Sequence, residues 1–296
     1  MDNVNIRAML KEDHYNVEKE IINNHTVLGL KDVIDDLFNS GKKIILTIGD
    51  VGVGKTIIAT KIASGLAERG KKIYLAITDP VVQLDFNINE ASGITMSYID
   101  EKAELEEYQE EVLSKARETM SAEQIAYVEE DMKSPFTQEI ALLRTVDKVI
   151  DKAKEQAEEQ AQDRIVVIDT APTGNTLLLL ESTQSENQET KSQQHYIPES
   201  AKKILSRLRN AKEVEVIIVT LAEATPVYEA MRLEDDLRRA DINTKWWVIN
   251  SSQYNTGNTN DMLLAKSSNE APWINKVDEH AGGNYAIIGW SIDEIK

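Results

Sequence analysis

A run of nine residues near position 50 combines the residue types that bind phosphate groups. The run is Gly49-Asp50-Val51-Gly52-Val53-Gly54-Lys55-Thr56-Ile57, and its first eight positions match the pattern G-x-x-x-x-G-K-[ST]. Its glycines allow backbone N–H groups to point at phosphate oxygens, and a helix that starts here adds its positive dipole end. We expect Lys55 to reach the β- and γ-phosphates and act in catalysis, and the Thr56 hydroxyl to ligate Mg²⁺. The run predicts a phosphate-binding loop (P-loop) in which all nine residues bind a nucleotide.

Two aspartates at the ends of apolar runs complete the predicted chemistry. A P-loop needs a second carboxylate on the metal ion, normally at the end of another strand. Asp169 ends the run Arg164–Asp169, so we expect it to share the Mg²⁺ ion with Thr56. Asp79 follows the apolar run 73–77, and a carboxylate there could orient the attacking water near the γ-phosphate. We therefore expect Asp79 to be catalytic.

The base that the nucleotide carries can be argued from two short segments. The tetrapeptide Asn275-Lys276-Val277-Asp278 resembles the N-K-x-D motif that reads guanine, but its surroundings predict a helix and a turn, whereas that motif follows a buried strand. Asn250 ends the apolar run 245–249 and is better placed to meet a purine edge. No aspartate follows Asn250 to bind a guanine amino group, so ATP is favoured and GTP remains the alternative.

Six short apolar runs predict strands that are buried on both faces. Their Ile and Val content is nearly continuous, as a parallel sheet covered by helices requires. The runs are Ile44–Ile48, Ile73–Ile77, Ile165–Ile168, Val214–Val219, Trp246–Ile249 and Tyr285–Ile288. Helical patterns separate them, and a further amphipathic helix is expected over 28–39. The chain is therefore predicted to be an α/β P-loop NTPase with a doubly wound, mostly parallel sheet flanked by helices.

Three stretches depart from this alternation of strands and helices. Residues 1–27 are polar and are expected to be a lead-in or linker before a P-loop domain over 28–296. Residues of about 100–160 are acidic and predict a helical insertion whose charges lie on a solvated face. These helices could be plain surface elements or a subdomain that binds a partner. Residues of about 182–199 are too polar to pack and predict a mobile loop.

Composition narrows the class of protein further. The 33 basic and 51 acidic residues give a net charge of −18, which disfavours binding to nucleic acid or to anionic lipid surfaces. Lysines and arginines form no cluster longer than the doublets Lys42-Lys43, Lys71-Lys72 and Lys202-Lys203. The absence of cysteine excludes disulfides and thiolate metal sites. No signal peptide and no apolar run long enough to span a bilayer is visible, so a cytoplasmic protein is expected.

Several further short motifs follow the pattern of a known protein family. They are the loop ending Gly-Val-Gly-Lys-Thr, Thr78-Asp79-Pro80, Glu129–Pro135, Asp169-Thr170-Ala171-Pro172-Thr173-Gly174, Leu177–Leu180, Thr225–Ala230 and Val248-Ile249-Asn250. With these motifs the chain resembles the arsenical pump-driving ATPases, which have a deviant Walker A loop and are related to ATPases that target tail-anchored membrane proteins. The resemblance covers roughly residues 28–290.

The resemblance implies a Mg²⁺-dependent ATPase that energises arsenite efflux together with a membrane pump subunit. It also implies a homodimer or two fused halves, and the lead-in of this chain looks like the linker before a second half. In the family an aspartate matching Asp79 acts in hydrolysis. Residues matching Glu223 and Asn250 contact the nucleotide.

The chain also departs from the family pattern. Asp50 and Val51 replace a Lys-Gly pair, and a carboxylate roughly 8 Å from phosphate costs about 2 kcal/mol per unit charge at a dielectric of about 20. Phe136 and Asn175 replace an expected cysteine and histidine. Without thiolates no direct thiolate-bound metalloid is expected. Two alternatives therefore stay open, an ATP-dependent targeting factor or chaperone for membrane-protein segments and a degenerate ATP-binding regulator with weak hydrolysis.

Overall fold

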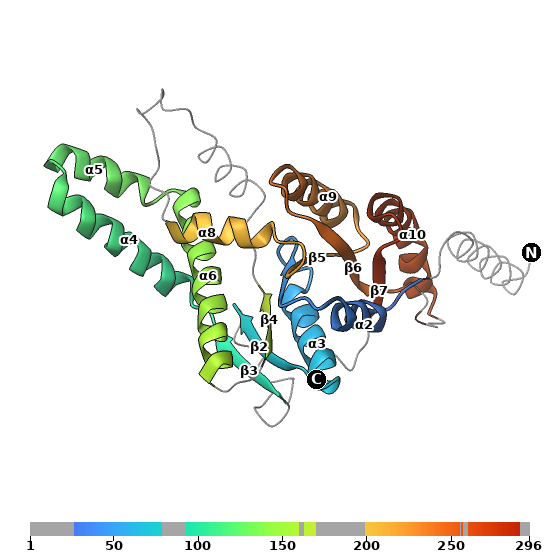
Figure 1. Ribbon diagram of the computed structural model, residues 1–296. Coiled ribbons are helices and arrows are strands. Elements are labelled where there is room, and N and C mark those ends of the chain that lie inside the picture. Colours follow the sequence, from blue (N-terminus) through green and yellow to red (C-terminus); the bar gives the residue numbers. More distant parts are fainter. Residues whose placement is uncertain are drawn as a thin grey trace, which may run out of the picture.

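Seven parallel strands form one sheet at the centre of the computed structural model (Figure 1). The structure describes residues 27–78, 93–159, 163–169, 199–254, 256 and 260–290, with backbone alone at 199–202. The strand order is β3-β2-β4-β1-β5-β6-β7, and every pairing is parallel. The strands are β1 (Ile44–Ile48), β2 (Lys72–Ile77), β3 (Ile94–Tyr98), β4 (Arg164–Asp169), β5 (Val214–Thr220), β6 (Thr244–Ser252) and β7 (Tyr285–Gly289).

The sequence predicts six of these strands and misses β3. The six predicted strands are buried on both faces for most of their length, which is why continuous apolar runs reveal them. In contrast, β3 lies at the edge of the sheet, and its last four residues are only partly buried or exposed. An edge strand of this kind can carry polar residues such as Thr95 and Ser97, so no apolar run marks it.

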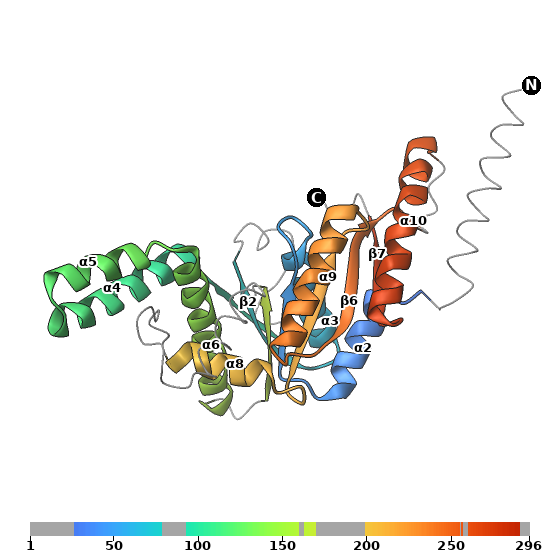
Figure 2. The ribbon, with the colours of Figure 1, turned by 90° about the horizontal axis from the view of Figure 1, so that it is seen from above.

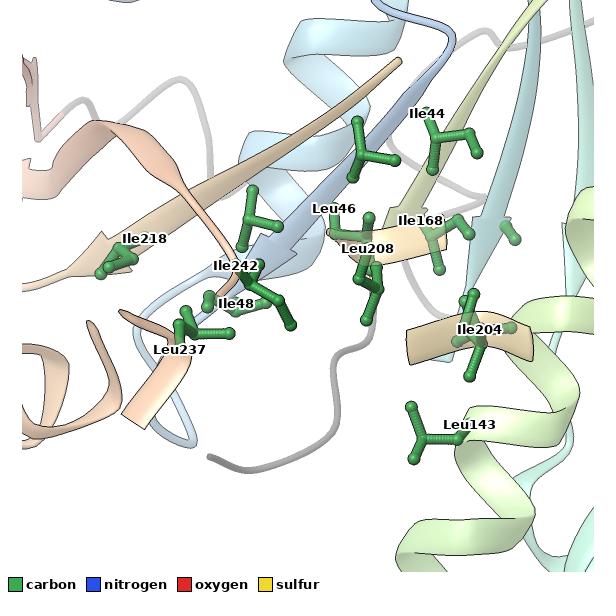
Figure 3. Packing of buried hydrophobic residues seen from close by; sticks show 14 of the residues in the cluster. Ile44, Leu46, Ile48, Leu143, Ile168, Ile204, Leu208, Ile218, Leu237 and Ile242 are labelled. Atoms are coloured by element: carbon green, nitrogen blue, oxygen red, sulfur yellow. The ribbon is translucent and has the colours of Figure 1, made fainter. Parts of the chain in front are cut away.

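Helices cover both faces of the sheet, as the prediction of a doubly wound α/β fold requires. Alternate residues of β1 point to opposite faces, so Ile45 packs with Val33 and Ile58 of one core cluster while Leu46 belongs to the other. The first cluster involves α2 (Leu30–Ser40) and α3 (Lys55–Glu68). The second cluster, part of which Figure 3 shows, involves α6 (Pro135–Glu159), α8 (Glu199–Leu208), α9 (Ala224–Arg239) and α10 (Asp261–Ala281).

The acidic helical region between β3 and β4 divides into two parts. The helices α4 (Glu101–Thr119) and α5 (Ala122–Asp131) extend away from the sheet (Figure 1, Figure 2), and α5 has no buried residue. The third helix, α6, instead packs on the sheet, because Leu143, Val146 and Ile150 are fully buried in the core. One helix of the predicted insertion is therefore a core element of the fold.

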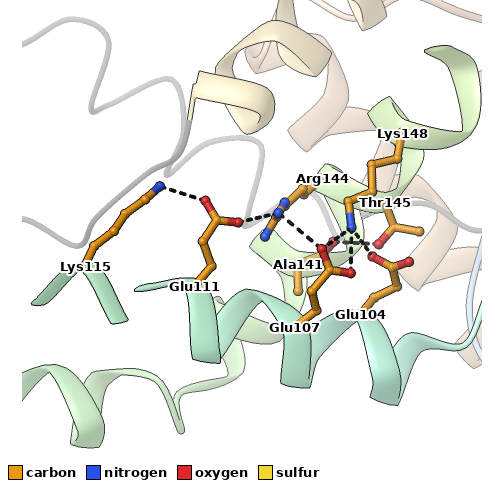
Figure 4. A network of polar contacts seen from close by, with 8 residues as sticks. All are labelled: Glu104, Glu107, Glu111, Lys115, Ala141, Arg144, Thr145 and Lys148. Atoms are coloured by element: carbon orange, nitrogen blue, oxygen red, sulfur yellow. Dashed lines mark hydrogen bonds and ion pairs between the residues drawn. The ribbon is translucent and has the colours of Figure 1, made fainter. Parts of the chain in front are cut away.

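Most charged side chains of this region are exposed or partly exposed, as expected for a solvated face, but several of them also form ion pairs between two helices. Three glutamates of α4 point toward α6, where Arg144 and Lys148 neutralise them (Figure 4). The Nζ atom of Lys148 lies 2.9 Å from carboxylate oxygens of both Glu104 and Glu107, and Arg144 pairs with Glu111. Because these charges belong to two packed helices, they link α4 to α6 while remaining partly exposed to water.

Other local predictions can also be compared with the structure. The helix expected over 28–39 is α2, and Gly41 ends it with a left-handed φ of 71°. The tetrapeptide Asn275–Asp278 lies inside α10, as predicted, and not at the end of a strand. The lead-in up to residue 26 and the loop over 182–198 lie outside the described residues. Within the described ranges, no helix is long and apolar enough to cross a bilayer.

The core position of α6 can be tested by truncating one of its buried side chains. We expect Leu143→Ala to lower the free energy of unfolding by about 2–5 kcal/mol, because Leu143 is 0% exposed and its removal leaves a cavity. Tyr127→Ala on α5 is the control, with an expected loss below about 0.5 kcal/mol because this side chain is 72% exposed. Urea unfolding followed by circular dichroism measures both. Equal midpoints for the two variants would place α6 outside the core.

Candidate nucleotide-binding site

The loop between β1 and α3 lies at the carboxyl edge of the sheet. The strand order continues in opposite directions on the two sides of β1. Strands β4 and β5 flank β1 and run parallel to it, so the carboxyl ends of β1, β4 and β5 lie at the same edge. Two glycines of the loop have no room for a side chain. A Cβ atom at Gly49 would lie 2.2 Å from the Val219 carbonyl oxygen, and one at Gly54 would lie 2.2 Å from Nδ2 of Asn250. Both glycines also have positive φ, so the close backbone packing of this loop requires glycine.

Lys55, Thr56 and Asp169 come together at this edge, as the sequence predicts. The Thr56 hydroxyl donates a hydrogen bond to Oδ2 of Asp169, although 113 positions separate the two residues. The ammonium group of Lys55 donates to the backbone carbonyl oxygen of Asp50 at 2.8 Å. Residues in the first turn of a helix and a carboxylate at the end of a neighbouring strand therefore face one small volume.

Burial sets the electrostatics of this group. Asp169 is 1% exposed, and its burial raises its pKa to about 6, against the hydrogen bond from Thr56 and the charge of Lys55. Burial also lowers the pKa of Lys55, while the carboxylates of Asp169 and Asp50 act in the opposite direction. Burial thus removes water from both the Asp169 carboxylate and the Lys55 ammonium group, and the attraction between these opposite charges offsets part of the cost.

The residues at this edge fit a Mg²⁺ ion. Mg²⁺ prefers oxygen ligands and usually takes one or two protein oxygens together with phosphate and water. The Oδ1 atom of Asp169 is buried and has no hydrogen-bond partner within the described part of the chain, so it has a lone pair to offer. Thr56 brings a hydroxyl to the same carboxylate. The sequence alone assigns no role to Thr78. In the structure its hydroxyl donates a hydrogen bond to the Asp169 carbonyl oxygen at 3.3 Å and so helps to position Asp169.

Asp50 and Val51 occupy the tip of the loop. The backbone N–H of Val51 donates to the Asp50 carboxylate at 2.7 Å, and the Val51 side chain is 92% exposed. The loop therefore satisfies one of its own N–H groups with an acidic side chain. In this arrangement that N–H group does not point at a phosphate.

Asn250 reaches the loop from the end of β6. Its Nδ2 atom donates to the Val53 carbonyl oxygen at 3.0 Å, and its Oδ1 atom is buried without a partner in the described part of the chain. The segment after Asn250 is held by a buried carboxylate that the sequence does not reveal. Glu270 of α10 accepts hydrogen bonds from the Ser252 hydroxyl at 2.6 Å and from the Gln253 N–H at 2.9 Å. Only the packing of α10 on the sheet brings Glu270 there.

The remaining predicted residues have different outcomes. Glu223 is the residue before α9, follows β5 at the same sheet edge and has an exposed side chain. Ile57 is part of the first turn of α3 and is partly buried. Asp79 lies outside the described residues, directly after Thr78. Their contacts with a nucleotide remain predictions.

The fold and the site define a P-loop NTPase. Strand β1 leads through a glycine-rich loop into a helix that begins with Lys-Thr, and an aspartate ends the neighbouring parallel strand β4. Residues 42–197 match the family model described as Anion-transporting ATPase, and the chain belongs to this family. It is 32% identical over 266 residues to an arsenical pump-driving ATPase of Escherichia coli. It is 33% identical over 271 residues to a protein of the same name from Acidiphilium multivorum.

The two alignments cover unequal shares of the aligned proteins. Each includes 88% of this chain but only 43% of the relative. The chain therefore spans less than half the length of these relatives.

The raised pKa of Asp169 predicts that its ionised carboxylate lowers the stability of the folded protein at neutral pH. Between its ordinary value of 3.8 and about 6, the folded protein binds more protons than the unfolded chain, so stability falls as the pH rises through this window. Without nucleotide, Asp169→Asn should therefore be more stable than the parent at pH 7, by up to about 3 kcal/mol. Below about pH 4 this gain should vanish.

Thermal unfolding at pH 4 and pH 7 measures the gain, and Asp50→Asn is the control because its carboxylate is exposed. A lower melting temperature for Asp169→Asn than for the parent at pH 7 would contradict the prediction.

Proposed function

We propose that this protein binds ATP with Mg²⁺ and hydrolyses it. The observation that carries the proposal is the hydrogen bond between Thr56 and Asp169 beside Lys55, at the mouth of a glycine-rich loop. Membership of the Anion-transporting ATPase family supports it. A site of this kind stabilises developing charge on the phosphates, and positioning together with electrostatics provides most of the catalysis.

Each side chain has a role in this proposal. Lys55 holds the β- and γ-phosphates with its ammonium group, and the N–H groups at the start of α3 add their partial positive charge. Thr56 and Asp169 hold Mg²⁺, which neutralises charge on the phosphate oxygens when it is bound. Asp79 orients the attacking water, and its place two residues after β2 puts it in the chain next to Thr78, which contacts Asp169.

We propose adenine as the base. The guanine alternative loses its support because Asn275–Asp278 lies within a helix, with Val277 fully buried. Asn250 and Glu223 are the proposed contacts, since Asn250 lies near the carboxyl end of β6, Glu223 follows β5, and both strands end at the edge where the P-loop lies. The unpartnered Oδ1 atom of Asn250 is an acceptor of the kind that an adenine amino group requires.

We further propose that the ATPase works with a second ATPase half or a second copy of this chain, and that it energises arsenite efflux through a membrane pump subunit. The name arsenical pump-driving ATPase belongs to the relatives, and their greater length supports the idea of a second half. The chain contains no cysteine, so we propose that it does not hold a metalloid through thiolates.

A specific observation favours a second candidate, a regulatory ATP-binding module with weak hydrolysis. The Asp50 carboxylate accepts the Val51 N–H, and the Lys55 ammonium group is bonded to the Asp50 carbonyl oxygen. ATP must replace both interactions and must also bring its phosphates near the Asp50 charge. Tight binding with little release of phosphate would support this second candidate.

The proposed roles of Lys55 and Thr56 can be tested by titration with ATP. We expect Lys55→Ala to weaken ATP binding about 10- to 100-fold, because a charged hydrogen bond to phosphate is lost. Thr56→Ala should remove most of the dependence of binding on Mg²⁺. Lys266→Ala is the matched control, because it removes one exposed lysine of α10 and should leave affinity unchanged. Calorimetry with ATP and GTP gives the affinities, and unchanged binding by Lys55→Ala would refute the site.

Removing the Asp50 charge distinguishes the two candidate functions. If a carboxylate near the phosphates limits the site, Asp50→Asn should bind ATP up to about 30-fold more tightly, from the estimate of about 2 kcal/mol, and less in high salt. Release of phosphate by the variant should also rise. A variant that binds more tightly but stays inactive would favour the regulatory module, and an unchanged affinity would show that Asp50 does not oppose the nucleotide.

A further inference from the structure

Two of the three lysine doublets in the sequence meet at a cavity on the amino-terminal edge of the sheet, opposite the P-loop. The cavity has a volume of about 350 Å³ and is lined by Lys42, Lys43, Lys71, Lys72 and Asp163, among others. Lys43 directly precedes β1, Lys72 begins β2, and Asp163 directly precedes β4. Because these three strands are neighbours in the parallel sheet, their amino ends lie side by side.

This lysine cavity is a local exception in a chain of net charge −18. Four lysines and one aspartate line it, and 29 residues separate Lys42 from Lys71 in the sequence. Phe38 and Ile165 contribute an apolar wall. The fold thus gathers positive charge at a place where the composition of the chain predicts none.

The four lysines are not equally available to a ligand. Lys42 is engaged in the structure, because its Nζ atom lies 3.1 Å from the buried Glu215 carboxylate and 3.0 Å from the Val214 carbonyl oxygen. Lys43 pairs with Asp163. Lys71 lies over the Phe38 ring, with its Nζ atom 4.8 Å from the ring centroid.

No carboxylate of the described ranges pairs with Lys71 or Lys72. Among the described residues, the ammonium groups of Lys71 and Lys72 therefore have no carboxylate counter-ion.

The two helix ends at the cavity are carboxyl ends, which do not attract an anion. Gly41 follows the end of α2, and Gly70 follows the end of α3, and both glycines line the cavity. Helix carboxyl ends carry partial negative charge, so any anion here must be held by the lysine side chains. Ammonium groups are compact point charges that bind phosphate without demanding a fixed geometry.

We propose that the lysine cavity is a second anion site, separate from the P-loop, which binds a small phosphate-bearing molecule with two or more negative charges. The volume is within the range of small-molecule pockets and favours a compact ligand over a protein segment. Two charges on the ligand match the ammonium groups of Lys71 and Lys72, which have no carboxylate partner in the described part of the chain. Since side-chain charges alone hold the ligand, its affinity falls steeply as salt is added.

Pyrophosphate and inorganic phosphate are the probes for this proposal, titrated by calorimetry into the full chain carrying Lys55→Ala so that the P-loop is weakened. We expect pyrophosphate to bind more tightly than phosphate, and Lys71→Gln with Lys72→Gln to weaken binding about tenfold. Lys71→Arg with Lys72→Arg keeps both charges and should retain binding. Thermal unfolding of each variant checks that the fold is intact.

The matched control is Lys102→Gln with Lys133→Gln, which removes the same charge from exposed positions on α4 and in the turn after α5. An equal loss of affinity in this control would overturn the proposal, because the general field of the protein would then be responsible. Absence of pyrophosphate binding would also overturn it and would leave the lysines as partners of the helix ends. So would an acidic octapeptide that binds more tightly than pyrophosphate, since the cavity would then serve a protein segment.

Discussion

The pairing of β1 with β4 is the constraint on which the site depends. Ile44, Ile45 and Leu46 lie opposite Val166, Val167 and Ile168, so the two strands end at the same edge, one with the P-loop and the other with Asp169. The hydrogen bond from Thr56 to Asp169 is a consequence of this register. A carboxylate with 1% exposure would be costly alone, but here it has a hydroxyl and a lysine beside it. The same burial strengthens every electrostatic interaction at this site.

Charged side chains elsewhere in the described part of the molecule also have partners of opposite charge on neighbouring helices. The acidic face of α4 is compensated by Arg144 and Lys148 of α6, and α6 is itself anchored in the core. On α8, Arg207 pairs with the buried Asp147 of α6. These contacts join the projecting helices to the sheet through one core helix. A partner that acts on α4 would therefore be connected with the face of the sheet that α6 covers.

Two observations bear on the proposed second ATPase half: the residues Asp50 and Val51 at the tip of the P-loop, and the greater length of the relatives. The exposed Val51 and the carboxylate of Asp50 lie next to each other at the tip of the loop. The alignments cover 43% of each of two relatives, and this share supports the proposal of a second ATPase half or a second copy.

The sequence by itself determined the P-loop, the aspartate that contacts Thr56 and six of the seven strands, because local sequence patterns specify each of them. A phosphate loop needs glycine and lysine at fixed spacing, and strands covered on both faces must be almost continuously apolar. The edge strand β3, the contact of Asn250 with the loop and the buried Glu270 depend on neighbours far away in the chain, so only the tertiary structure decided them. The same holds for two lysine doublets that lie apart in the sequence and meet because parallel strands begin at one edge.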